Sequence, residues 1–298
     1  MEAKWLEDFL SLARTGNFSQ SAAERNITQS AFSRRIKSLE QWVGVSLIDR
    51  SSYPTRLTLA GQQFHEAARN ATTSLLKVRG ELRQAQNADR HLLRIAVQHS
   101  LAGRFLANWL AQLPLQKDDT LVLVKADNLH DCVRDLEEGN VDMLVSYAHR
   151  ELPISLSDER YLSILMTEDT LCAISKSDGH GRPLFTLDPG SSQPIPWLTY
   201  SPEAFLGRAA ALALERGAMP LPLHAVYESA LAEALRAAAL AGLGLAWLPL
   251  SMVAEDLASG ALMRAGSKDY DVPLQVRMFI DRAMGKSRLL SVITDLDA

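Results

Sequence analysis

Cysteine is scarce in this sequence, which places only Cys132 and Cys172 among its 298 residues. The two are not spaced as metal ligands, and each lies in an apolar context. A disulfide framework and a metal site are therefore not expected. We interpret both cysteines as small core residues.

A long hydrophobic run is also missing. The chain has no uninterrupted apolar stretch of about 18 residues, the length of a membrane-spanning helix. It begins "MEAKWLEDFL", with acidic residues where a secretory signal carries a basic stretch and then an apolar one. We therefore expect a cytoplasmic globular protein. A length of 298 residues with 47% hydrophobic side chains suits two domains, each with its own core.

The sequence motifs of common enzymes are absent as well. We find no GxGxxG after a strand, no GxSxG, no Walker loop and no HExxH. His99 beside Ser100 suggests an activated nucleophile, but adjacent residues on a turn seldom point at each other, and no orienting acid is identifiable. We expect no catalytic residues and no cofactor. A transport-type solute-binding protein would lack the N-terminal 90 residues and would normally carry an export signal.

Charge is present but unevenly distributed. Residues 1–90 carry 13 Lys and Arg against 9 Asp and Glu, whereas residues 91–298 carry 18 against 26. The net charge of −4 thus divides into +4 and −8. A basic segment on an acidic body indicates a module that binds a polyanion, although an excess of this size can also be a solvated face.

The first 43 residues have the pattern of three short helices. Apolar residues recur at helical spacing from Lys4 to Arg14, and "TGN" then breaks the pattern. Ser19 can cap a second helix, and a third begins near Thr28 or Gln29. The apolar residues of the third helix must face the core, and they are Phe32, Ile36, Leu39 and Val43.

The third helix turns short hydrogen-bonding groups and cations outward near its N-terminal end. A helix-turn-helix protein reads the major groove in this way, because Arg can bridge guanine O6 and N7 and Gln can bridge adenine N6 and N7. The following "SLIDRSSYPTRLTLAG" predicts a short β-wing whose arginines can meet phosphates or a minor groove. An exposed amphipathic helix whose arginines only keep it soluble is the alternative. The candidate DNA-binding residues are Thr28, Gln29, Ser30, Ser33, Arg34, Lys37, Arg50 and Arg56.

A seven-residue apolar repeat follows the wing. Its members are Leu57, Gly61, Phe64, Ala68, Ala71, Leu75, Val78, Leu82 and Ala85. This is the pattern of a coiled-coil seam, which would pair two copies of the chain and hold two reading helices at the separation that a palindromic DNA site requires. The alternative is a helix that lies on its own domain.

Strand-like and helical runs alternate beyond "QNADRHL", which is the pattern of an α/β domain. The strand-like runs are "LLRIAV", "TLVLVKA", "VDMLVSY", "LSILM", "TLCAIS", "LGLAWLP" and "VPLQVRMFI". Helical runs such as "HDCVRDLEEG" and "AEALRAAALAG" separate them. Open α/β sheets bind ligands at the carboxyl ends of strands, and "AVQHSLAGRFL" places Ser100 at such a point.

Three segments together resemble the LysR-type transcriptional regulators in order and spacing. They are "FSQSAAERNITQSAFSRRIKSLEQWVGVSLIDR", "RLTLAG" and, far downstream, "GLGLAWLP". The resemblance implies an α/β protein with an all-α winged helix-turn-helix domain in residues 1–58, a dimerising linker helix in 59–90, and a two-lobed, periplasmic-binding-protein-like domain in 91–298. The implied lobes are residues 91–162 with 268–298 for lobe one, and 163–267 for lobe two.

The same resemblance implies partners and site residues. It implies a homodimer through the linker helix, assembled as a homotetramer, which binds pseudo-palindromic promoter sites in double-stranded DNA, with RNA polymerase as a further partner. Position by position, it gives Gln29, Ser30, Ser33 and Arg34 to the reading helix and Arg50 to the wing.

Three residues depart from the family pattern. Arg25 stands where the family usually has a core Leu, Ser21 where it has Ala, and Tyr53 where many members have a wing Arg. The first two bring the packing of the second helix into question, and the third brings one wing contact into question.

Four shorter segments are similar to the hypochlorite-responsive branch of the family, and they are "NFSQSA", "AFSRR", "HSL" and "AWLP". Methionine-based oxidant sensing is not carried over, because Leu206 and Ala230 stand where that branch is expected to have methionine. Met143, Met166 and Met278 lie in strand-like runs and are interpreted as core residues.

A small-molecule effector is expected between the two lobes. The Ser100 hydroxyl and the backbone N–H groups after it can meet an anion, and "WLTYS" ends another strand-like run. A small carboxylate is therefore the expected ligand, unless these hydroxyls only bond their own backbone. The candidate effector-binding residues are His99, Ser100, Leu101, Tyr147, Thr199, Ser201 and Tyr227. The alternative function is a DNA-binding regulator without such a ligand, which responds to oxidation or acts as a nucleoid-type binder.

Overall fold

The structure is a computed structural model that describes residues 2–51, 54–85, 91–113, 120–188, 190, 193–216 and 221–282. The chain divides into two compact units, residues 1–86 and 87–298. In the part of the chain that the structure describes, no helix is long and apolar enough to cross a membrane.

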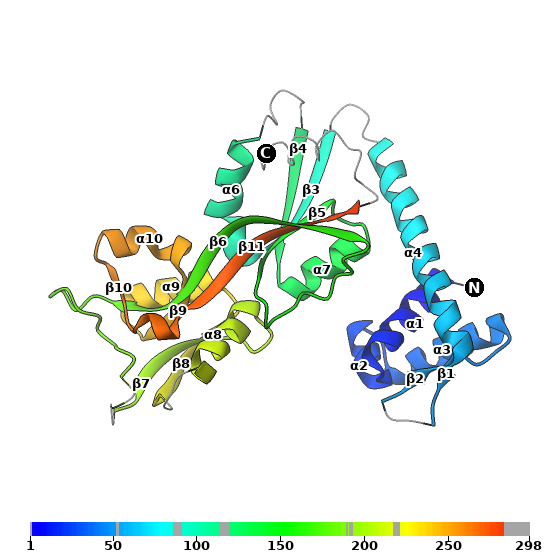
Figure 1. Ribbon diagram of the computed structural model, residues 1–298, viewed down its shortest axis with the longest axis horizontal. Coiled ribbons are helices and arrows are strands. Elements are labelled where there is room, and N and C mark those ends of the chain that lie inside the picture. The colour runs from blue at the N-terminus through cyan, green and yellow to red at the C-terminus, as the bar shows by residue number, and fades with distance from the viewer. Residues whose placement is uncertain are drawn as a thin grey trace. The chain divides into compact units, whose positions relative to one another are not determined.

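The first unit is a helical domain with a two-stranded wing (Figure 1). Its elements are α1 (Ala3–Thr15), α2 (Phe18–Glu24), α3 (Gln29–Val43), β1 (Ile48–Asp49), β2 (Arg56–Leu57) and α4 (Leu59–Ala85). The two strands are antiparallel, with Ile48 opposite Leu57. The three predicted helices and the predicted wing are therefore confirmed.

One hydrophobic core orients α3 in this unit. The apolar side chains of α1 and α3 that form it are each at most 2% exposed, and they are Leu6, Phe9, Leu12, Phe32, Ile36 and Leu39. Val43, the fourth residue predicted to face the core, is only partly buried against it. Each fully buried side chain of this kind contributes about 1.5–3 kcal/mol. The polar face of α3 is thereby turned to solvent.

Local chemistry sets the ends of these helices. α1 ends at Gly16, whose φ of 62° is a left-handed conformation that glycine adopts without strain. The prediction that Ser19 caps α2 is wrong, because Asn17 has the extended backbone of a cap and its side chain accepts two backbone N–H groups of the first turn. Thr28 caps α3, with its hydroxyl 3.3 Å from a first-turn backbone nitrogen.

Polar groups hold α2 where the family pattern has apolar ones. Asp8 of α1 is fully buried and accepts hydrogen bonds from Arg25 Nε at 3.0 Å and Arg35 Nη1 at 3.2 Å. Arg25 also pairs with Glu7. Burial alone would lower the pKa of Arg25, but the hydrogen bond to Asp8 and the nearby carboxylate charges outweigh it and raise that pKa. Buried Ser21 shares a 2.6 Å hydrogen bond with the hydroxyl that ends α1.

The apolar side chains of α4 change from buried to exposed along the helix. Near its start, Phe64 and Ala68 pack on the core of the first unit, and a Cβ at Gly61 would collide with the carbonyl oxygen of Leu47. Further along, Leu75 and Val78 are 59% and 50% exposed. The side chains of Leu82 and Ala85 lie outside the described residues. The apolar stripe therefore begins as core and continues onto the surface.

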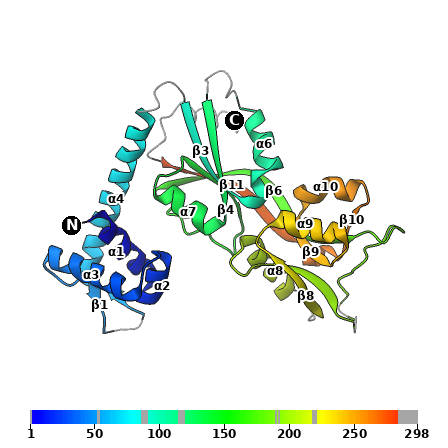
Figure 2. The same cartoon turned by 180° about the vertical axis from the view of Figure 1, so that it is seen from behind.

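The second unit is a mixed sheet flanked by helices (Figures 1 and 2). Its strands are β3 (His91–Gln98), β4 (Thr120–Asp127), β5 (Met143–Ala148), β6 (Tyr161–Lys176), β7 (Ile195–Tyr200), β8 (Leu223–Ser229), β9 (Leu245–Pro249), β10 (Leu262–Arg264) and β11 (Val272–Asp281). Its helices are α5 (His99–Ala102), α6 (Arg104–Ala111), α7 (Leu129–Glu137), α8 (Phe205–Arg216), α9 (Ala232–Ala241), α10 (Leu250–Ala258) and the 3-10 turn η2 (Lys268–Tyr270). The strand order is β4-β3-β5-β11-β6-β9-β7-β8, with β10 paired to β6.

Two long antiparallel strands join two sets of parallel strands in this sheet. β3 is parallel to β4 and β5, and β7 is parallel to β8 and β9. Between these sets, β6 and β11 run antiparallel to each other. The predicted α/β class is confirmed. The runs "LSILM" and "TLCAIS" are one strand, β6, because the polar residues between them lie on an accessible part of the strand.

The sulfur-containing side chains are packing residues. Cys132 and Cys172 are free and buried, and burial raises the pKa of each thiol to about 12. Met143 and Met278 are at most 3% exposed, and Met166 packs partly buried against the same core. The interpretation of these residues as core residues is confirmed.

Candidate DNA interface and ligand cavity

The predicted reading face of α3 is accessible. Gln29, Ser30, Arg34 and Lys37 are exposed, and Ser33 is half-buried. Within the described residues, neither Arg34 nor Lys37 forms an ion pair. The accessible face of α3 therefore offers Gln29, Arg34 and Lys37 to a ligand, while the Ser30 hydroxyl shares a 3.2 Å hydrogen bond with the capping hydroxyl of Thr28. Thr28 is exposed too, but its hydroxyl caps the helix.

Arg50 of the wing contacts residues of its own unit. Its Nη2 lies 2.8 Å from Glu40 Oε2, and its guanidinium carbon lies 5.5 Å from the centroid of the Phe18 ring. This geometry gives Arg50 a structural role, and its predicted DNA contact stays a prediction. Arg56 is exposed and forms no ion pair within the described ranges, so it is the better candidate for a phosphate contact.

Glu40 is a residue that the sequence reasoning missed. Its Oε1 accepts hydrogen bonds from the backbone N–H groups of Leu47 and Ile48 at 2.9 and 3.1 Å, while its Oε2 accepts one from Arg50. Glu40 thereby ties the last turn of α3 to the wing. Its sequence signal was slight, since a glutamate in this helix equally suits a solvated face.

The predicted effector residues around Ser100 have different surroundings. His99, Ser100 and Leu101 begin α5, where Ser100 is half-buried and Leu101 is 1% exposed in the core. Among the described residues, the Ser100 hydroxyl has no hydrogen-bond partner. Thr199 donates to the carbonyl oxygen of the next residue at 3.2 Å, and Ser201 is half-buried just after β7.

The two predicted aromatic walls do not face one site. Tyr147 is 1% exposed, and its hydroxyl donates to Asp169 Oδ2 at 3.1 Å. Burial raises the pKa of Tyr147 well above its ordinary value, and the Asp169 charge adds to this effect. Tyr227 lies on the edge strand β8 and is 39% exposed. The structure thus places Tyr147 in the core rather than in a ligand wall, because its position on β5 points it inward.

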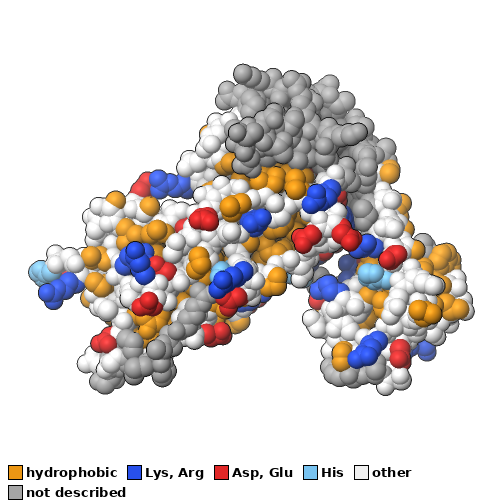
Figure 3. Space-filling model, viewed as in Figure 1, with side chains coloured by type: hydrophobic (Ala, Val, Ile, Leu, Met, Phe, Trp, Pro, Cys, Tyr) orange, Lys and Arg blue, Asp and Glu red, His pale blue; other side chains and the backbone are white. Residues whose placement is uncertain are grey.

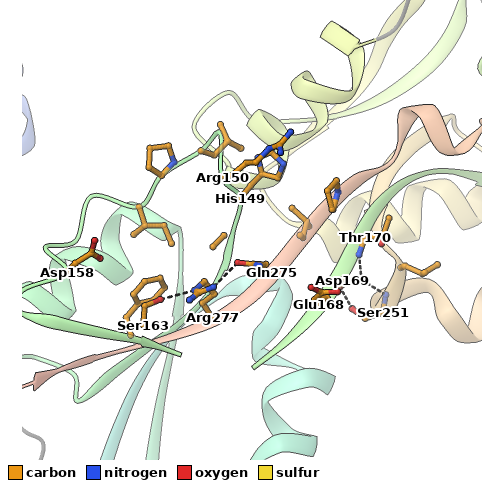
Figure 4. A pocket seen from close by; sticks show the side chains of 18 of the residues that line it. His149, Arg150, Asp158, Ser163, Glu168, Asp169, Thr170, Ser251, Gln275 and Arg277 are labelled. Atoms are coloured by element: carbon orange, nitrogen blue, oxygen red, sulfur yellow. Dashed lines mark hydrogen bonds between the residues drawn. The ribbon is translucent and has the colours of Figure 1, made fainter. Parts of the chain in front are cut away.

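A cavity of about 960 Å³ lies over β5, β6 and β11, beside the start of α10 (Figure 4). Figure 3 shows hydrophobic side chains over these strands, with charged side chains of both signs at the margin. None of the seven predicted effector residues lines this cavity. Its charged side chains are Arg150, Asp158, Glu168, Asp169 and Arg277, and His149 lines it as well.

Hydrogen bonds fix several polar groups of the cavity. Arg277 donates from Nε to Ser163 Oγ and from Nη1 to Gln275 Oε1, both at 2.8 Å. Asp169 accepts from the Ser251 hydroxyl at 2.5 Å and from its backbone nitrogen at 3.1 Å, which holds the first turn of α10. Sequence reasoning missed this cavity. The signal was the polar residues at alternate positions of "VPLQVRMFI", which put Gln275 and Arg277 on one face of a strand.

Comparisons with known proteins cover both units. Residues 3–62 match the family of bacterial regulatory helix-turn-helix proteins of the lysR family, and residues 86–296 match the LysR substrate binding domain. The chain is 34% identical over 276 residues to the HTH-type transcriptional regulator YjiE of Escherichia coli K12, which covers 92% of this chain and 87% of that protein.

Solved structures agree with these matches. The full-length structure of HypT from Salmonella typhimurium, a hypochlorite-specific LysR-type transcriptional regulator, has 32% identity and a TM-score of 0.60 and covers 99% of this chain and 97% of that chain. Vibrio fischeri DarR in complex with DNA has 30% identity and a TM-score of 0.57, with 94% and 92% covered.

These matches confirm the predicted fold class and the resemblance seen in the sequence. The similarity to HypT supports the resemblance to the hypochlorite-responsive branch. The family is one of transcriptional regulators and not of enzymes. The chain belongs to the LysR family and is a DNA-binding transcriptional regulator with an effector-binding domain.

Proposed function

We propose that the protein is a sequence-specific regulator that reads pseudo-palindromic promoter sites with α3. The exposed N-terminal half of α3 carries this proposal, because Gln29, Ser30 and Arg34 reach solvent there. Arg and Gln side chains on a helix in the major groove distinguish guanine and adenine by paired hydrogen bonds. A dimer would place two such helices on half-sites one helical turn apart.

Replacing Arg34 by alanine is expected to lower affinity for the specific site by about 1–3 kcal/mol and to relax sequence preference. Arg56→Ala is the matched control, since a lost phosphate contact weakens all sequences evenly and reduces the salt slope by about 1. Anisotropy titrations of both variants on upstream and random DNA, at several salt concentrations, measure both effects. Equal losses of Arg34→Ala on the two DNAs would show that Arg34 does not read bases.

The assembly that we propose is a homodimer through α4, assembled further into a homotetramer. Support for the first interface is the exposed pair Leu75 and Val78. Support for a second interface comes from the edge strands of the sheet. Leu121, Leu123 and Val124 of β4 are 43–47% exposed, and β8 is likewise accessible along its middle. Exposed apolar edge strands are surfaces that another chain can cover.

We further propose that a small carboxylate controls the regulator by binding at Ser100. The Ser100 hydroxyl has no partner among the described residues, so the alternative that it bonds its own backbone finds no support there. Thr199, by contrast, does bond the neighbouring backbone. Thiol oxidation is disfavoured as the signal, because burial raises the pKa of Cys132 and Cys172 to about 12 and keeps both as unreactive thiols.

Ser100→Ala is expected to abolish the stabilisation that a bound carboxylate gives. A thermal-shift screen of small carboxylic acids on wild type detects a ligand, because a ligand that binds only the folded state stabilises by RT ln(1 + [L]/Kd). Thr199→Ala is the control and should keep most of the shift, since its hydroxyl is already bonded. A carboxylate that shifts wild type and Ser100→Ala equally would place its site elsewhere.

A further inference from the structure

Two charges of opposite sign line the cavity over β5, β6 and β11 without an ion-pair partner of their own. Arg277 is half-buried, and among the described residues its guanidinium donates only to neutral groups, Ser163 Oγ and Gln275 Oε1. Within the described residues, no carboxylate pairs with Arg277, and no cation pairs with Glu168. A cation taken partly out of water is costly unless a counter-charge compensates it. The cavity therefore suits a ligand that supplies that charge.

Strand register sets the separation of these two charges. Glu168 of β6 lies opposite Gln275 of β11, and Arg277 is two residues further along β11. Two residues of a strand span about 7 Å, and no ion pair joins the two side chains within the described residues. Figure 4 shows these side chains in the same order along the cavity, with Gln275 between Arg277 and Glu168. A molecule with a carboxylate at one point and an ammonium nearby can bridge this gap through charge-assisted hydrogen bonds of about 2.8 Å at each end.

A change of register lies next to Arg277. Val276 pairs with Thr167 but Arg277 pairs with Leu165, so Met166 is an extra residue on β6. Bulges of this kind re-aim side chains and are over-represented beside functional sites. The bulge separates the Glu168 part of the cavity from the Ser163 part.

The other groups around the cavity select against singly charged ligands. Asp158 and Asp169 add two carboxylates, and Asp169 already accepts hydrogen bonds from the hydroxyls of Ser251 and Tyr147. Arg150 is 84% exposed and pairs with the next residue, so it stays largely in water. A simple anion would meet a lining with three carboxylates, whereas a simple cation would leave Arg277 uncompensated. The apolar part of the lining includes Leu152, Ile154 and Phe279.

We propose that this cavity binds a zwitterionic amino acid with an apolar side chain. Its carboxylate meets Arg277, its ammonium group meets Glu168, and its side chain lies against the apolar part of the lining. This site goes beyond the carboxylate site proposed at Ser100, because no residue of that site lines the cavity. The two long strands β6 and β11 join the two sets of parallel strands, so a ligand on them contacts the link between those sets.

Calorimetric titration of the full-length protein with L-leucine, L-isoleucine, L-valine, L-methionine and L-phenylalanine tests this proposal. At least one of them is expected to bind. Arg277→Gln, which keeps a hydrogen-bonding side chain, should weaken the binding about tenfold or more, the factor that losing a hydrogen bond to a charged group produces. Ser100→Ala should bind that amino acid as wild type does, so failure of the Ser100 site leaves this result unchanged.

Glu168→Gln separates the two ends of the ligand and changes only an exposed side chain. It should weaken binding of the amino acid but leave unchanged the weaker binding of the matching carboxylic acid without its amino group, which for leucine is 4-methylpentanoate. This arm keeps the test valid if Arg277→Gln does not fold. Absence of binding by all five amino acids overturns the proposal. Binding that is unaffected by Arg277→Gln and Glu168→Gln, or that is lost only in Ser100→Ala, overturns it as well.

Discussion

The double substitution Leu75→Glu with Val78→Glu is expected to convert the protein into a species that no longer dimerises through α4. Both side chains are at least half exposed in one chain, and both lie on the seven-residue stripe that predicts a coiled-coil seam. In a dimer the glutamates would bury four carboxylates without partners, and a buried charge without a partner is strongly destabilising. Sedimentation velocity should show a smaller assembly.

The loss of dimerisation should also weaken DNA binding. A dimer that contacts both half-sites binds the DNA far more tightly than two separate monomers do, because its second contact becomes intramolecular. Affinity for a two-half-site DNA should fall by more than about tenfold, while affinity for a single half-site should change little. Ser74→Glu is the matched control, because Ser74 is exposed on the same turn but lies off the stripe. A double variant that sediments like wild type would place the dimer contact elsewhere.

The second large effect is a loss of stability of the first unit, which we expect for Asp8→Ala. This change leaves Arg25 and Arg35 without the fully buried carboxylate that both hold. Breaking a buried ion pair typically costs about 3–5 kcal/mol, and the lower end applies here because both guanidiniums are partly exposed and can rehydrate. Amide hydrogen exchange in α1, α2 and α3 should accelerate roughly a hundredfold, since about 1.4 kcal/mol corresponds to a factor of ten.

Glu7→Ala is the control for this experiment. Within the residues that the structure describes, Glu7 pairs only with Arg25, and its side chain is 31% exposed, so its removal should cost about 1 kcal/mol or less. Exchange in the second unit should not change in either variant. If Asp8→Ala exchanges no faster than Glu7→Ala, the position of α2 does not depend on the buried carboxylate.

The sequence predicted the elements whose pattern is repeated and local. α1 and α3 follow from apolar spacing, and the wing follows from a polar segment between two short apolar ones. Most strands of the second unit follow from β-type runs bounded by helices. Predictions based on a single residue were less secure. Ser19 fits a cap as well as Asn17 does in sequence, and only the backbone geometry decides between them.

The interactions that the sequence did not predict are those that join distant segments. Asp8 and Arg25 are 17 residues apart, and Asp169 reaches Ser251 across 82 residues. Neither pairing has a spacing signature, because it depends on how helices and strands meet in three dimensions. The same reasoning applies to Tyr147, whose position at a strand end suggested a ligand wall, although packing directs its ring inward.

The central claim is that this protein binds a specific promoter sequence through α3. Competition binding of the full-length protein to the DNA upstream of its own gene, against random DNA at fixed salt, tests it most directly. We predict a preference of about 10³ or more for a site within the upstream DNA, and a loss of most of that preference in Arg34→Ala. Equal affinity for upstream and random DNA, unchanged by Arg34→Ala, would contradict the account and indicate a nucleoid-type binder.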